Sequence, residues 1–169
     1  MLPAGNVLIT DKNGVFVDIV SHTEAGEGVE QFNGILCPGF INAHGHLELS
    51  HLKGIIPERA GLVDFVFKVI TERDFAAEDI LTAIEKAENE MLRNGIVAVG
   101  DICNTANSKK IKESSALYYH SYIELFGFNP EKVDELFDTG LAVKDEFGSL
   151  PTSIVPHAPY SVSKDLFRH

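Results

Sequence analysis

The sequence is short of basic residues, cysteines and long apolar runs. Its 169 residues include 14 basic and 25 acidic side chains, which give a formal net charge of −11, and only two cysteines. An acidic chain without a basic stripe repels phosphate backbones, which argues against nucleic-acid binding. Cys37 and Cys103 are too few for a disulfide framework or a cysteine-based zinc site, so we expect reduced thiols. No apolar run approaches the roughly 18–20 residues of a membrane span, and no signal-peptide pattern begins the chain. We therefore predict a cytoplasmic protein without a membrane segment.

The residues that are present predict two parts of different character. Hydrophobic residues make up 44% of the chain, enough for a substantial core. Two β-type runs, at residues 7–10 and 15–20, flank the turn-forming sequence of residues 11–14, which is typical of a hairpin. From residue 38 onward, strand and helix patterns alternate instead.

This alternation predicts a parallel α/β architecture. We expect strands at residues 39–46, 96–102, 117–126 and 153–157, separated by helical patterns at residues 62–73, 78–93, 108–115 and 129–148. Right-handed crossovers put the C-terminal ends of parallel strands on one side of the sheet. His46, Asp101, Glu124 and His157 all lie at such ends, where α/β barrels carry their chemistry.

His44 and His46 are the strongest candidates for a chemical site. Side chains two residues apart on a strand point to the same face, so both imidazoles can reach one ion. Neutral imidazoles suit zinc, iron or nickel better than magnesium or calcium. The spacing alone is more often that of two ordinary histidines than of a ligand pair, and its position at a strand end is what favours the metal site.

Two motifs resemble one family. PGFINAHGH at residues 38–46 and PHAPYSVS at residues 156–163 closely resemble the amidohydrolase superfamily, in its branch of nucleoside and base deaminases and triazine chlorohydrolases. The segment HLELSHLKG at residues 46–54 is similar to deaminases of adenosine-like compounds, including the aminodeoxyfutalosine deaminases. The resemblance implies a (β/α)8 TIM-type barrel with a small β-sandwich. Residues 1–37 would then be part of the β-sandwich domain, and residues 38–169 the first four β/α units, the N-terminal half of the barrel.

The resemblance also implies site residues. His44 and His46 would bind one catalytic divalent metal ion, zinc or alternatively iron, and His157 would hydrogen-bond the substrate. The alternative for His157 is a histidine held within its own loop. Glu48, placed on the same face as His46 by strand alternation, would accept hydrogen bonds from a substrate amine or hydroxyl, or it is only a carboxylate of the rim.

For the other polar candidates, the sequence leaves two possible roles open. Asp101 would support a ligand histidine or, as the simpler expectation, cap the helix that follows it. His120, Tyr122 and Glu124 share one face of the third strand and would line the barrel interior or form a structural polar network.

A metal ion at this site predicts hydrolysis. Bound metal lowers the pKa of its water toward about 7, and the resulting hydroxide would add to an amidine-like ring carbon, from which ammonia leaves. The glutamate that donates the proton in this family, and the remaining metal ligands, are expected beyond residue 169. Because such a barrel needs about 250 residues, we expect the chain to be a fragment that is inactive alone. Its open sheet would expose interior side chains and favour a homo-oligomer.

Three functions follow. The first is part of a metal-dependent hydrolase of carbon–nitrogen bonds, which deaminates a small-molecule substrate such as a purine-like nucleoside or a cyclic amidine. The second is a triazine chlorohydrolase or an amide hydrolase on the same fold. The third is a half-barrel that serves as a non-catalytic assembly module.

Overall fold

The computed structural model describes residues 5–59 and 61–169, and it divides into two compact units with the boundary between Pro38 and Gly39. In the first unit, β1 (Asn6–Thr10) pairs antiparallel with β2 (Phe16–Ser21). The N–H groups of Val15 and Asn13 donate to Asp11 Oδ1 over 2.9 and 2.8 Å, which closes the turn. These bonds hold the pKa of the Asp11 carboxyl below its ordinary value. The predicted hairpin is confirmed, whereas its membership of a β-sandwich stays a prediction.

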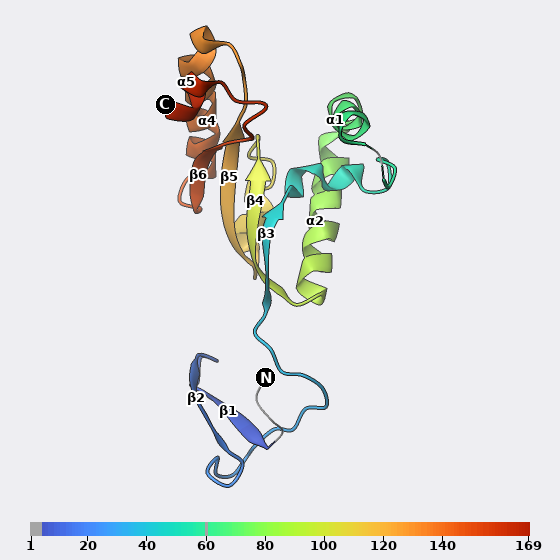
Figure 1. The fold of residues 1–169 in the computed structure, drawn as a ribbon. Coiled ribbons are helices and arrows are strands. Elements are labelled where there is room, and N and C mark those ends of the chain that lie inside the picture. Colours follow the sequence, from blue (N-terminus) through green and yellow to red (C-terminus); the bar gives the residue numbers. More distant parts are fainter. Residues whose placement is uncertain (1–4, 60) are drawn as a thin grey trace. The chain divides into compact units, whose positions relative to one another are not determined.

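The second unit alternates strands with helices. Its elements are β3 (Phe40–Gly45), the 3-10 helix η1 (Leu47–Leu52), α1 (Leu62–Thr71), α2 (Ala77–Arg93), β4 (Ile96–Cys103), α3 (Lys109–Ser114), β5 (Tyr118–Leu125), the 3-10 turn η2 (Pro130–Lys132), α4 (Val133–Phe147), β6 (Thr152–Pro156) and α5 (Lys164–Arg168). The four strands form one parallel sheet in the order β3-β4-β5-β6 (Figure 1). This confirms the predicted parallel α/β architecture.

Helices cover one face of the sheet. The buried residues alternate along the two central strands: Val99, Asp101 and Cys103 on β4, and Tyr119, Ser121, Ile123 and Leu125 on β5. Val99 and Tyr119 pack with Ile84 of α2 and Ile111 of α3, and Cys103 and Ile123 pack with Phe147 of α4. Burial raises the pKa of the Cys103 thiol to about 12, so it stays protonated at neutral pH.

The opposite face carries half-buried polar residues. His120, Tyr122 and Glu124 of β5 alternate with the buried set and therefore lie on this second face. His120 Nε2 lies 2.9 Å from Ser153 Oγ of β6, and its ring centroid lies 4.7 Å from that of Tyr122. The three residues thus share a face, as predicted, and His120 makes a polar contact with the neighbouring strand β6.

Helix α1 exposes most of its apolar side chains. It has no buried residue, and its Leu62, Val63, Phe67 and Ile70 are all more than 60% exposed. Across residues 5–59 and 61–169, none of the helices combines the length and apolar composition that a membrane crossing requires.

Candidate active site

His44 and His46 lie side by side where β3 ends. Their ring centroids are 5.3 Å apart, with the ring planes inclined by 57°, and both residues are exposed. Within the described part of the chain, neither ring hydrogen-bonds to another residue, so the ring nitrogens are available to a ligand. Two accessible imidazoles at this separation fit a divalent ion with nitrogen preference. The structure therefore brings the two predicted ligands together, while their binding of metal stays a prediction.

The pair is not joined by a third ligand among the residues that the structure describes. No group of three or more histidine, cysteine, aspartate or glutamate side chains is placed there to hold a metal ion.

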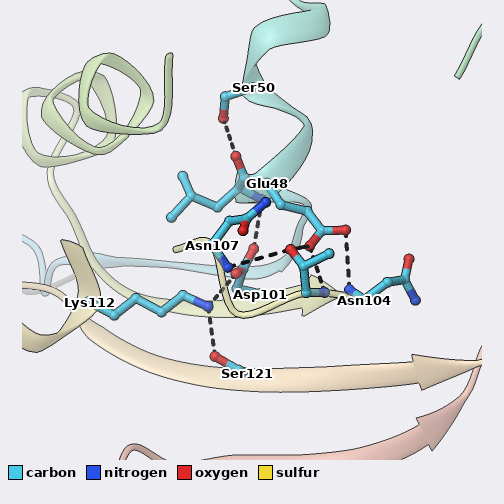
Figure 2. Close-up of polar contacts among 9 residues, drawn as sticks. Glu48, Ser50, Asp101, Asn104, Asn107, Lys112 and Ser121 are labelled. Atoms are coloured by element: carbon cyan, nitrogen blue, oxygen red, sulfur yellow. Dashed lines mark hydrogen bonds and ion pairs between the residues drawn. The ribbon is translucent and has the colours of Figure 1, made fainter. Parts of the chain in front are cut away.

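The chain turns sharply after the pair. His46 has φ −125° and ψ 79° and is the N-cap of η1, so the strand ends at Gly45, one residue earlier than predicted. Leu47 N–H donates to Asp101 Oδ1 over 2.7 Å (Figure 2). The expectation that Asp101 caps the helix after its own strand is wrong, because its carboxylate accepts instead from the first residue of η1, 54 positions earlier.

Asp101 is also half of a buried ion pair that sequence reasoning missed. Its Oδ2 lies 2.5 Å from Lys112 Nζ of α3, and both side chains are completely buried. Lys112 Nζ donates further to Ser121 Oγ of β5 over 2.7 Å (Figure 2). The ammonium also lies 4.9 Å from the Phe147 ring centroid and 5.4 Å from that of Tyr119. Four elements, η1, β4, α3 and β5, are thereby linked through the ion pair of Asp101 and Lys112.

Glu48 does not continue the strand, so the reasoning that placed it beside His46 by alternation is wrong. It belongs to η1 and is only 5% exposed. Its Oε1 accepts from Asn104 N–H over 3.1 Å, and its Oε2 accepts from Thr105 N–H over 3.0 Å and from Thr105 Oγ1 over 2.7 Å. The carboxylate therefore holds the loop between β4 and α3 (Figure 2), and a bond from it to a substrate stays a prediction.

Replacing Glu48 with glutamine should destabilise the protein by about 1–3 kcal/mol. Glutamine keeps the shape, but it loses the charge that strengthens all three bonds and turns an NH2 group toward backbone donors. Urea denaturation measures the change in free energy of unfolding. The exposed Glu58 offers a matched control, since Glu58→Gln should change that free energy by less than about 0.5 kcal/mol. Equal stability of the two variants would show that the bonds to Asn104 and Thr105 contribute nothing.

His157 stands at the C-terminal end of β6. Its N–H donates to Leu125 O over 3.0 Å, and its Nδ1 lies 2.5 Å from Ser161 Oγ. Its Nε2 lies 3.9 Å from Glu124 Oε2, which belongs to the neighbouring strand. The side chain of His157 is 35% exposed and that of Glu124 is 11% exposed. Nδ1 thus holds His157 within its own loop, whereas Nε2 lies beside Glu124 at the end of β5. The structure is therefore compatible with both predicted roles, a histidine held within its loop and a substrate contact.

Comparison with known proteins places these features in one family. The profile described as "Amidohydrolase family" matches residues 35–169. An adenosine deaminase of Helicobacter pylori is 30% identical over 137 residues, which cover 79% of this chain and 33% of that protein. An aminodeoxyfutalosine deaminase of Nitratiruptor sp. is 27% identical over 140 residues, covering 77% of this chain and 33% of that protein. The chain thus spans about a third of the length of these relatives.

Solved structures agree on the fold. Helicobacter pylori aminofutalosine deaminase in complex with methylthio-coformycin superposes with a TM-score of 0.74 at 27% identity, covering 94% of this chain and 40% of that one. Atrazine chlorohydrolase TrzN from Arthrobacter aurescens, complexed with zinc, gives a TM-score of 0.66 at 18% identity, covering 96% and 47%. The second likeness is one of fold alone. Together with the four-stranded parallel sheet, these likenesses confirm the predicted fold class, an N-terminal part of a TIM-type barrel.

Proposed function

The chain belongs to the amidohydrolase family, and on this premise we propose that it is part of a metal-dependent hydrolase that deaminates a purine-like nucleoside or another cyclic amidine. Residues 38–169 would supply the first four β/α units of the barrel, and residues 1–37 part of a small β-sandwich domain. The observation that carries the proposal is the pair of exposed imidazoles, 5.3 Å apart, at the C-terminal end of β3. The named activities of the two curated relatives above support an adenosine-like substrate.

Some residues of this chain would bind the metal ion, and others would contact the substrate. His44 and His46 would hold the ion, zinc or alternatively iron, through ring nitrogens. A bound divalent ion supplies hydroxide at neutral pH. His157, held at Nδ1 by Ser161, would direct Nε2 toward a substrate that lies at the strand ends. Glu124, beside it, would face the same space. The cytoplasmic location and the homo-oligomer stay predictions.

The test uses the protein with its complete barrel, loaded with zinc. Adenosine, 5′-deoxyadenosine, 5-methylthioadenosine, S-adenosylhomocysteine, aminodeoxyfutalosine and guanine are each incubated with it, and ammonia release is followed. We expect ammonia from at least one adenosine-type compound, loss of that activity on treatment with a zinc chelator, and its return with added zinc. Chloride release from atrazine serves as the competing assay. Ammonia release that continues at the same rate after zinc removal, or chloride release without ammonia release, would contradict the proposal.

A further inference from the structure

We propose that the buried ion pair of Asp101 and Lys112 positions the metal-binding segment by fixing the backbone immediately after His46. This inference rests on the proposed function, because it concerns the ion that His44 and His46 would hold. Neither side chain of the pair would touch that ion or a substrate, since both are completely buried and Asp101 lies on the helix-covered face of the sheet. They are therefore positioning residues.

The hydrogen bond from Leu47 N–H to Asp101 Oδ1 fixes the backbone next to His46. The peptide bond is planar, so holding the N–H of Leu47 also sets the direction of the His46 carbonyl and, with it, the ψ angle of His46. That angle is 79° at the point where the strand becomes a 3-10 helix. The bond to Asp101 Oδ1 is 2.7 Å long and buried, so water does not compete for it. On the other side of His46, Gly45 lies opposite Asp101 in the β3–β4 register. The backbone is thus tied to β4 on both sides of His46.

The Asp101 carboxylate is itself held in place by Lys112. A buried carboxylate is stable only when its charge is compensated and its oxygens are engaged. Lys112 compensates the charge at Oδ2, and Lys112 is held in turn by Ser121 Oγ and by the rings of Phe147 and Tyr119. The carboxylate therefore cannot turn away from Leu47 without breaking its contact with Lys112 of α3, which is itself held by β5. The ion pair of Asp101 and Lys112 therefore fixes the peptide plane between His46 and Leu47 relative to the core.

Two double variants separate this positioning from stability. Asp101→Asn with Lys112→Met removes both charges but keeps a carbonyl oxygen that can accept from Leu47. Asp101→Leu with Lys112→Met removes the same charges and also the acceptor. Leucine and asparagine have similar shapes, and replacing a whole buried ion pair is far milder than removing one partner. Thermal unfolding checks that both variants fold. Asp101→Ala with Lys112→Met, which introduces no added bulk, replaces the leucine variant if that one does not fold.

The measurement is zinc affinity, determined by competition with a chelator of known affinity in the protein with its complete barrel. We expect the variant without the acceptor to bind zinc about tenfold more weakly, the lower end of the effect of groups that orient metal ligands. The asparagine variant should retain the affinity of the unaltered protein. Equal zinc affinity of the two double variants, while His44→Ala loses zinc, would overturn this inference alone. Undiminished zinc binding by His44→Ala would instead overturn the proposed function.

Discussion

Replacing either His44 or His46 with alanine should remove the bound metal from the protein with its complete barrel and reduce deamination by more than about 100-fold. Groups that only orient metal ligands are typically worth 10–100-fold, so loss of a ligand should exceed about that range. Each substitution deletes one of the two imidazoles that β3 brings within 5.3 Å of each other. The two variants should therefore behave alike, because one imidazole cannot hold the ion in the geometry that hydrolysis requires.

Zinc content by elemental analysis and ammonia release give the two readouts. His22→Ala is the matched control, since His22 is an exposed histidine that belongs to the first unit. That variant should keep both its zinc and its activity. If His44→Ala or His46→Ala kept a full equivalent of zinc, or turned over substrate at the unaltered rate, the pair could not be a pair of metal ligands.

Replacing Lys112 with methionine should destabilise the protein by about 3–5 kcal/mol, the typical cost of stripping a buried charge of its partner. Methionine fills a similar volume, so the effect arises from the Asp101 carboxylate, which is left completely buried without a cation. Lys110 lies on the same helix, two residues away, but is exposed. The control Lys110→Met should therefore change the free energy of unfolding by less than about 0.5 kcal/mol.

Adding Asp101→Asn to Lys112→Met should restore most of the lost stability, because the unpaired charge is then gone. Denaturant unfolding of the single and double variants measures this directly. A single variant as stable as Lys110→Met, or a double variant no more stable than the single one, would show that the two buried charges do not depend on each other.

The alternation of strands and helices could be read from the sequence because it depends on local periodicity. The helix from Ala77 to Arg93 keeps Ile80, Ile84 and Ala87 on one face, and the structure packs these residues against the sheet. The adjacency of His44 and His46 is equally local, since only Gly45 separates them where β3 ends. For this reason the candidate metal ligands were found without knowledge of the tertiary structure.

The contacts around that pair were not predictable in the same way. The short 3-10 helix after His46 carries no periodic pattern long enough to distinguish it from a continuing strand, and so Glu48 was placed on the wrong element. Lys112 follows Lys109 and Lys110 in a short polar segment and has the sequence appearance of an exposed lysine. Only its tertiary contact with Asp101 of β4 shows that it is buried.

The most direct test of the central claim is a crystal structure of the protein with its complete barrel, grown with zinc and measured at the zinc absorption edge. We expect an anomalous peak with one ring nitrogen of His44 and one of His46 at about 2.0–2.1 Å from it. A zinc ion bound elsewhere, with both rings outside coordination distance, would contradict it.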